Sequence, residues 1–387
     1  MRSGSQLEER IAGRLALLSQ AGLLRTLRAP AGIDLSSNDY LCLAADPRVV
    51  AVFQTACARE GVGSTGSRLL RGQRAAFDAI ERRFAEVKQA ERALYYSSGY
   101  LANIAVLSTL TESGDVVFSD ALNHASLIDG MRLSRARRVV FAHADVGALA
   151  QAMDREPCQG VRFVVVESLF SMEGDFAPLG ELAALCRATN AVLVVDEAHA
   201  VGVYGARGTG LIENADLTGV VCLSINTAGK ALGVAGAFVA GPSWAIEYLV
   251  QRSRPFVFST APPPALADAL GQSLDIVRDE PGRRATVQAR AGYLRRQLRD
   301  AGVRTTEGSS HIVSIPIGDN TRAVVVAERL CAAGFDVRAI RPPSVPDGTA
   351  RLRVSVNAGL SERDLARFAA AASAVFERAG LCSAVSS

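Results

Sequence analysis

Lys230 is the residue of this 387-residue sequence that is best suited to covalent chemistry. It is the one charged residue between Leu217 and Ile246, and a lysine in apolar surroundings generally has a partner or a chemical task. The chain contains 40 arginines but only two lysines, Lys88 and Lys230, so an ordinary surface cation would be expected to be arginine. A desolvated lysine can act as an amine nucleophile, whereas arginine cannot. We therefore predict that Lys230 forms a Schiff base; the alternative is a lysine at a helix start whose amine reaches solvent. Lys88 is expected to be an ordinary residue of a charged helix.

The sequence also supplies the groups that pyridoxal phosphate needs beside such a lysine: an acid for the ring nitrogen, a phosphate site and a partner for the ring face. Asp196 ends the apolar run 192–196, and a buried acid at a strand end is costly unless it meets a cation. Residues 98–100 open a helical stretch, whose free N–H groups are a natural anion site. Thr227 adds a hydroxyl near the lysine. His124 is placed to stack on the ring, although a lone histidine is more often structural.

Two further motifs do not fit the nucleotide functions they suggest. Residues 61–66 match G-x-G-x-x-G, but the stretch before them is predicted to be a helix, and the acid at the right distance, Glu86, lies inside another helix. We expect a glycine-rich turn at the mouth of a site. Asp196-Glu-Ala-His199 spells a D-E-A-H box, but no G-x-x-x-x-G-K-[ST] loop accompanies it. Asp196 and His199 suit a metal ion less well, because no second ligand pair is present, and no metal site is predicted.

Short apolar runs alternate with amphipathic stretches from residue 90 onward, which is typical of an α/β fold with a mostly parallel sheet covered on both faces. The predicted strands are 93–97, 115–118, 138–142, 163–167, 192–196, 220–224 and 236–240. Ligands bind at the carboxyl ends of such strands. Residues 98–99, Glu167, Asp196 and the segment after Ser224 all lie at or just beyond these ends.

A smaller α/β unit is predicted at the C-terminal end of the chain. Two helical stretches, 265–278 and 285–301, are expected to lead into it, and its expected strands are 312–317, 336–340 and 351–356. Asp319 and Ser361 have the positions and chemistry of helix N-caps. With an amphipathic helix at 5–28, the expected organisation is an N-terminal helix and arm (1–45), a large cofactor-binding domain (46–275) and a small domain (276–387).

The composition argues against several classes of protein. A net charge of +3 is close to neutral for this length, which disfavours nucleic-acid binding. Seven cysteines without a C-x-x-C pair argue against a disulfide framework or a thiolate zinc site. No apolar run reaches the roughly 18 residues of a membrane span, and the N-terminus lacks the apolar core of a signal peptide. The expectation is a cytoplasmic protein that binds neither nucleic acid nor membrane.

These residues are carried by motifs that resemble those of the α-oxoamine synthases, which are fold-type-I pyridoxal phosphate transferases. The resemblance covers nearly the whole chain and is greatest for the branch of the family that acts in biotin synthesis. The matching segments are 35–41, 66–72, 98–103, 123–126, 167–175, 196–199, 227–230, 258–260 and 339–353.

The resemblance implies a role for each matching residue. Lys230 would carry the cofactor, Asp196 would pair with the pyridine nitrogen and His199 would hydrogen-bond the ring hydroxyl. The catalytic set would be these three with His124. The remaining implied cofactor contacts are Ser171, Gly99, Tyr100, Thr227 and, from a second subunit, Thr260. Arg353 and, in preference to Arg28, Arg25 would bind substrate.

The same resemblance implies a homodimer with shared active sites that joins L-alanine to a pimeloyl thioester with loss of carbon dioxide. The carrier of the acyl group, coenzyme A or an acyl carrier protein, stays open; Arg68 and Arg71 would suit its phosphates. Alternatives are glycine with an acetyl or succinyl thioester, serine with a long acyl thioester, or binding without turnover. Three departures from the family pattern, Ala228, Thr65 and Leu360, bear on packing under the phosphate and on the acyl pocket.

Overall fold

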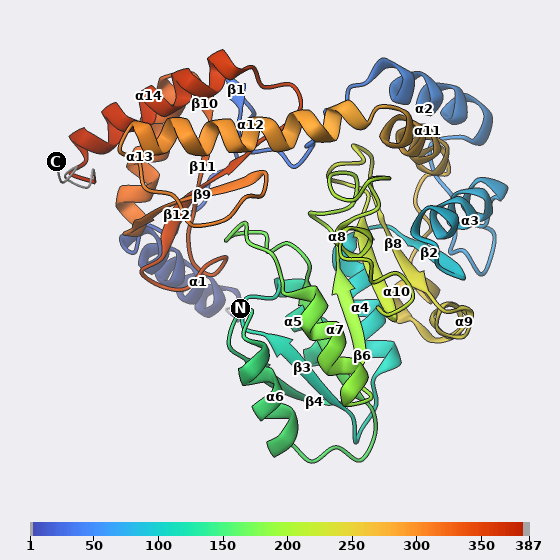
Figure 1. Cartoon of the computed structure of the whole chain (residues 1–387). Helices are drawn as coiled ribbons and strands as arrows, with labels where there is room; N and C mark the ends of the chain where they lie inside the picture. Colours follow the sequence, from blue (N-terminus) through green and yellow to red (C-terminus); the bar gives the residue numbers. More distant parts are fainter. Residues whose placement is uncertain (1–2, 382–387) are drawn as a thin grey trace. The chain divides into compact units, whose positions relative to one another are not determined.

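The computed structural model describes residues 3–381, which form two compact units (Figure 1). The central unit contains Asn38–Ser171 and Asp175–Thr286. The other unit, called the C-terminal unit below, contains the residues up to Ser37, the short segment Met172–Gly174 and the residues from Val287 onward. The expected ranges 1–45, 46–275 and 276–387 differ from this division. Residues 3–37 and 172–174 group with the C-terminal unit, and residues 38–45 and 276–286 group with the central one.

The central unit is built on a seven-stranded sheet of order β2-β8-β7-β6-β5-β3-β4. Five of its strands, from β7 to β4, are parallel, and β8 runs antiparallel to both β7 and β2. The predicted mostly parallel sheet is therefore confirmed. Its strands are β2 (Arg92–Tyr96), β3 (Val116–Asp120), β4 (Arg137–Phe141), β5 (Arg162–Glu167), β6 (Val192–Asp196), β7 (Leu223–Thr227) and β8 (Ala237–Gly241).

The strand predicted at 220–224 begins three residues too early, because β7 is Leu223–Thr227. The apolar run Val220–Ser224 suggested the earlier start. The strand instead continues through the polar residues Asn226 and Thr227, which the sheet and its neighbours cover. This shift places Thr227 at the carboxyl end of the strand, where ligands bind in sheets of this kind.

Helices cover the sheet because each strand alternates apolar side chains between its two faces. One face packs against α4, α5 and α9 in a single apolar core, whereas α3 lies against β2 and β8, where Phe84 stacks on Phe238 with ring centroids 4.0 Å apart. The helices are α2 (Pro47–Glu60), α3 (Ala75–Lys88), α4 (Gly99–Leu110), α5 (Ala125–Leu133), α6 (Val146–Arg155), α7 (Leu179–Ala188), α8 (Leu211–Asn214), α9 (Ser243–Arg252), α10 (Arg254–Val257) and α11 (Ala265–Asp279). The turn at 61–66 follows helix α2 and Glu86 lies within α3, so the context that argued against a dinucleotide fingerprint is confirmed.

The C-terminal unit has a three-stranded antiparallel sheet of order β11-β12-β9 and a short parallel pair of β1 with β10. The predicted N-caps are confirmed: Asp319 accepts from Arg322 N, and Ser361 forms a capping box with Asp364. The N-terminal helix is shorter than expected and ends before Gly22, which has a φ of +64°. The elements are α1 (Ser3–Gln20), β1 (Ile33–Asp34), α12 (Pro281–Asp300, which begins in the central unit), β9 (Ile312–Gly318), α13 (Asn320–Ala332), β10 (Phe335–Asp336), β11 (Arg338–Ile340), β12 (Ala350–Ser355) and α14 (Glu362–Arg378).

Lys88 is not the ordinary helical residue that was expected. Its Nζ is buried and donates to Glu197 Oε2 at 2.5 Å and to the Thr209 carbonyl at 2.7 Å. Glu197 Oε1 accepts the backbone N–H groups that open α8, from Leu211 and Ile212. Removing one partner of a buried ion pair costs about 3–5 kcal/mol. The pair therefore anchors the segment directly after Asp196.

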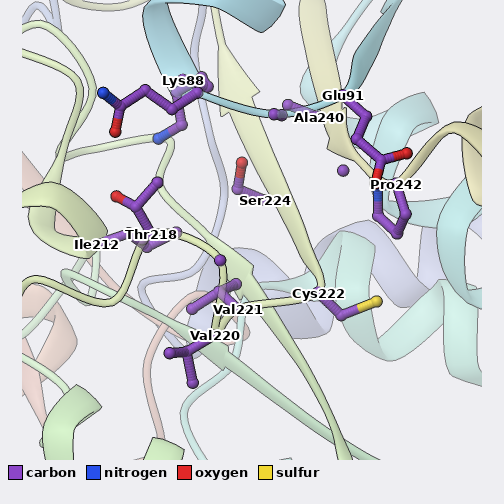
Figure 2. Close-up of a pocket in the computed structure, with 14 residues that line it drawn as sticks. Lys88, Glu91, Ile212, Thr218, Val220, Val221, Cys222, Ser224, Ala240 and Pro242 are labelled. Atoms are coloured by element: carbon purple, nitrogen blue, oxygen red, sulfur yellow. The ribbon is translucent and has the colours of Figure 1, made fainter.

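Lys88 also borders a pocket of about 400 Å³ that contains none of the predicted site residues. Figure 2 shows this pocket, with Lys88 on one side and Cys222 and Pro242 on the other. It lies at the amino end of β7, so it is at the opposite edge of the sheet from Thr227. The predicted chemistry does not use it.

His143 forms a charged clamp near the carboxyl ends of the strands. Its Nδ1 lies 2.9 Å from Asp120 Oδ1 and its Nε2 lies 2.8 Å from Asp175 Oδ2. Burial disfavours the protonated ring, but hydrogen bonds to the two carboxylates and their charges outweigh it and raise the pKa of His143 to about 10. The ring also packs edge-on against Phe170 with centroids 4.4 Å apart, so the clamp supports the loop that carries Ser171.

We predict that the clamp makes stability depend on pH between neutral and alkaline conditions. Because the folded-state pKa of His143 is raised, its stabilising effect is fully present below its ordinary value of 6.5 and is lost as pH rises through about 10. The urea midpoint of the wild type should fall over this window, and Asp175→Asn should flatten the fall. An equal pH dependence in the two proteins would contradict the clamp.

Candidate active site

Lys230 lies in the tight turn that joins β7 to β8, as its position after Thr227 requires. Backbone hydrogen bonds close the turn, from Ala228 N to Gly236 O at 2.8 Å and from Gly233 N to Lys230 O at 2.8 Å. A Cβ on Gly236 would come within 2.4 Å of the Tyr95 ring, so no larger residue fits there. The lysine therefore projects from a backbone with little freedom to move.

The Lys230 amine meets His199, the last residue of the D-E-A-H segment. Lys230 Nζ lies 2.8 Å from His199 Nε2, and the histidine is only 5% exposed. The sequence predicted these residues for one site from their types and from the resemblance, although they are 31 positions apart. The structure places them in direct contact.

Asp196 ends β6 with its carboxylate held by neutral donors. Oδ2 accepts from the Asn103 side chain at 2.7 Å, and Oδ1 accepts from Ala198 N at 2.8 Å. Asn103 also donates to Ser126 Oγ at 2.9 Å, so it links Asp196 to the start of α5. Sequence reasoning gave Asn103 no role, although an amide within the apolar helix α4 was a usable signal. A buried carboxylate oriented in this way suits a cationic partner.

His124 is the N-cap of α5, and its Nδ1 accepts from Ser126 N at 3.2 Å. Burial lowers the pKa of His124; the charge of Asp196 opposes this effect and the charge of Lys230 adds to it. The ring is therefore predominantly neutral at pH 7. A neutral, fixed imidazole beside Asp196 and Lys230 is suited to stacking on a flat heterocycle.

Glu167 is a second buried acid at this edge that sequence reasoning left without a role. It pairs in register with Asp196 across β5 and β6 and accepts backbone N–H groups of His124 and Ser171. Burial first and the charge of Asp196 second raise its pKa well above the ordinary value, against the opposing effect of Lys230. Glu167 thus joins two predicted cofactor contacts through their backbones. Its place at a strand end was the signal in the sequence.

The start of α4 meets Thr227 at the predicted phosphate site. Ser98 caps the helix by accepting from Leu101 N at 3.2 Å, and Gly99 begins it. A Cβ on Gly99 would come within 2.4 Å of Thr227 Oγ1, so glycine is needed for the two elements to approach. Free N–H groups at a helix start together with a hydroxyl form an anion site. Tyr100 is 43% exposed and donates its hydroxyl proton to Asp129.

The remaining predicted residues are placed as follows. Ser171 is buried at the end of its segment of the central unit, and Thr260 is exposed on the segment before Pro262. Arg353 and Arg25 belong to the C-terminal unit. Arg353 is buried on β12 and donates to Ser355 Oγ at 2.7 Å, and Arg25 donates to Pro342 O at 2.9 Å. Their substrate roles stay predictions.

One expectation for the carrier phosphates is wrong. Arg68 is buried, forms a two-pronged ion pair with Glu81 at 2.9 and 3.1 Å, and lies over the Phe77 ring. Its Nε also donates to Gln73 and its guanidinium lies near the Phe256 ring, so structural contacts occupy the group. Arg71 remains exposed.

The three departures from the family pattern occupy different settings. Ala228 is fully buried in the lysine turn. Thr65 has a φ of +60°, a conformation that favours glycine. Leu360 is buried in the core of the C-terminal unit.

The chain matches known proteins over most of its length. The model of the aminotransferase class I and II family matches residues 30–371. A putative 8-amino-7-oxononanoate synthase of Bacillus licheniformis is 42% identical over 93% of this chain and 95% of its own length. An 8-amino-7-oxononanoate synthase of Burkholderia cenocepacia is 45% identical over 88% of this chain and 85% of its own length.

Solved structures share the fold. Serine palmitoyltransferase of Sphingomonas wittichii superposes with a TM-score of 0.91 at 30% identity, covering 99% of this chain and 100% of that one. The 8-amino-7-oxononanoate synthase of Francisella tularensis gives a TM-score of 0.77 at 27% identity, covering 90% and 98%. With these matches and a site built around Lys230, the chain belongs to the aminotransferase class I and II family and, within it, to the α-oxoamine synthases.

Proposed function

We propose that this enzyme condenses L-alanine with a pimeloyl thioester, with loss of carbon dioxide, to give 8-amino-7-oxononanoate for biotin biosynthesis. The reaction class is carried by one observation, the contact of Lys230 Nζ with His199 Nε2 beside the buried Asp196. The substrate pair is supported by the relatives that are 42% and 45% identical and bear that enzyme's name.

Pyridoxal 5'-phosphate is the cofactor of this family, and the residues of the central unit fit it. Lys230 offers the amine, Asp196 a fixed carboxylate, His124 a neutral ring face, and the Gly99–Thr227 contact an anion site. When bound, the cofactor supplies an electron sink for the α-carbon of an amino acid. By the same fit we assign His199, Ser171, Tyr100 and, from a partner subunit, Thr260 to its binding.

The residues of the chain supply proton transfer and orientation. The Lys230 amine takes the proton from Cα of alanine and returns a proton to the same carbon at the end. Between these events the alanine Cα bonds to the pimeloyl carbonyl carbon, the carrier thiol leaves, and the alanine carboxylate departs as carbon dioxide. His199 holds the amine in place, and the bond from Asn103 holds the Asp196 carboxylate where positive charge must be stabilised. Arg353 and Arg25 bind the substrate carboxylates in this proposal.

We expect the purified enzyme to release free thiol and carbon dioxide when given L-alanine and a pimeloyl thioester. The panel should include serine with a palmitoyl thioester, because serine palmitoyltransferase shares the fold with a TM-score of 0.91, and glycine with acetyl and succinyl thioesters. Coenzyme A and carrier-protein forms of each donor identify the carrier. If the enzyme turns over another pair but does not turn over L-alanine with any pimeloyl thioester, the proposed substrates are wrong.

We predict that borohydride reduction of the cofactor-loaded protein attaches the cofactor covalently to Lys230. Peptide mass spectrometry can decide this cleanly, because the chain offers only Lys88 and Lys230 as lysine acceptors. Lys230→Ala should lose the visible absorption band and the reducible attachment and should lower turnover by several orders of magnitude. Attachment to Lys88, or an unchanged band in Lys230→Ala, would contradict the role of Lys230.

We also propose a homodimer, formed over an exposed apolar surface around Thr260. Two segments of the central unit are joined there by hydrogen bonds, from Ala261 N to Gly66 O at 2.9 Å and from Ser64 Oγ to Pro262 O at 2.6 Å. Large apolar side chains on these segments face solvent: Val62, Leu70 and Phe258 are 84%, 82% and 72% exposed. Such patches usually mark interfaces.

The dimer is tested by light scattering on the full chain. The wild type should have twice the monomer mass, and Leu70→Arg with Phe258→Arg should shift it toward the monomer. Trp244→Arg changes an exposed apolar residue on α9, at 64% exposure; it is the control and should leave the mass unchanged. A monomeric wild type would refute the dimer and the shared site.

No helix within residues 3–381 is long and apolar enough to cross a membrane. A cytoplasmic location is part of the proposed function. It is supported by the six described cysteines, which are all free thiols, the state that reducing compartments maintain.

A further inference from the structure

Tyr40 is a fully buried residue of the central unit that contacts His199 on the side away from Lys230. Its phenol oxygen lies 2.6 Å from His199 Nδ1, while His199 Nε2 lies 2.8 Å from Lys230 Nζ. The imidazole therefore stands between the phenol and the amine, with one ring nitrogen toward each.

The segment that carries Tyr40 is held in place independently of His199. The Asp39 carboxylate accepts from Leu43 N at 2.8 Å and from Ala44 N at 3.0 Å, and Arg283 donates to Leu41 O at 2.9 Å. These bonds close a turn around the tyrosine. The phenol is thus held in a fixed position, and the protonation of the imidazole nitrogen that faces it must suit the hydrogen bond between them.

The hydrogen bonds of the phenol determine where the proton of the imidazole lies. Tyr40 donates its single hydroxyl proton to Asn38 Oδ1 at 2.9 Å, so its oxygen is left with lone pairs toward His199. If the phenol hydrogen stays in the bond to Asn38, the hydrogen of the 2.6 Å contact belongs to His199 Nδ1, which donates it to the phenol oxygen. In a neutral ring the other nitrogen, Nε2, has no hydrogen and can accept one from Lys230.

We propose that Tyr40 is a positioning residue that fixes His199 as the Nδ1–H tautomer, so that Nε2 is a hydrogen-bond acceptor for the Lys230 amine. Burial makes this assignment matter, because His199 is only 5% exposed and water cannot readily replace a lost partner. The orientation of a ring nitrogen by the partner of the other nitrogen is a general property of histidine. Its consequence for catalysis rests on the proposed function, but the tautomer itself does not.

The test is nitrogen-15 magnetic resonance of the full-length, cofactor-free protein labelled at histidine. The chain has only four histidines, and His199→Asn identifies the signals of His199. The wild type should show a protonated Nδ1 and an unprotonated Nε2. In Tyr40→Phe, which removes only the hydroxyl, the ratio of the Nδ1–H to the Nε2–H form should fall by roughly fivefold to tenfold, as expected for one lost hydrogen bond.

Tyr96→Phe is the matched control. Tyr96 is also buried and also loses a hydroxyl contact, to Ser253 Oγ at 3.3 Å, so it should leave the His199 signals unchanged. A predominant Nε2–H form in the wild type would overturn the proposal, and this result does not depend on whether any variant folds. Unchanged His199 signals in a folded Tyr40→Phe protein would overturn it as well.

A second readout uses the cofactor-loaded protein. Tyr40→Phe should still bind cofactor, but its visible absorption maximum should be shifted relative to the wild type. Tyr96→Phe should have the same maximum as the wild type. An unshifted maximum in Tyr40→Phe would contradict the link from Tyr40 to the cofactor site. If the wild type shows no visible band, the proposed function is wrong. The tautomer of His199 is then still decided by the nitrogen-15 measurement alone.

Discussion

The central unit depends on keeping ionisable groups buried at the carboxyl edge of its sheet. Asp196 and His199 are each 5% exposed, and Glu167 is 3% exposed. Burying each of these side chains without a hydrogen-bond partner would cost free energy. Each of them lies within a few residues of a strand end and has such a partner there. Asn103 and a backbone N–H hold Asp196, and Lys230 meets His199. The rest of the unit can be understood as the framework that keeps these partners together.

Lys88 shows how far this framework extends. Its ion pair with Glu197 lies directly beside Asp196 in sequence, and Glu197 also binds the start of α8. An ammonium group is compact and donates in three directions, which suits the carboxylate and the carbonyl it meets. Both lysines occupy sites that are at least partly buried and bonded, whereas arginine supplies the exposed cations as well as buried ones such as Arg68.

The fold alone does not separate the members of this family. Serine palmitoyltransferase superposes over almost the whole chain, yet its sequence identity is 30%, against 42% to 45% for relatives named 8-amino-7-oxononanoate synthase. The groups around Lys230 serve chemistry that these reactions share. Function therefore depends on the residues of the site rather than on the fold.

The sequence by itself determined the type of sheet and the helices, and it singled out residues that the structure brings together, such as Lys230 with His199 and Gly99 with Thr227. Apolar runs and caps reveal strands and helix starts because both depend on local patterns, as at Val192–Asp196 and Ser361. The exceptional lysine at 230 was visible because its neighbours are uncharged. Sequence reasoning did not assign Asn103, Glu167 or Tyr40 to the site. An amide in an apolar helix and an acid at a strand end were signals for the first two, but the partners of all three are distant along the chain, and only the fold identifies them.

Only the tertiary structure decided what Lys88 and Arg68 do. In the sequence both lie among charged residues and suggest exposure, whereas in the fold each is buried against a carboxylate. It also decided the end of β7, since polar Asn226 and Thr227 continue a strand that local hydropathy would end. The physical reason is the same in each case. Whether a polar group is buried depends on which partners the fold brings to it, and hydropathy along the chain carries no record of those partners.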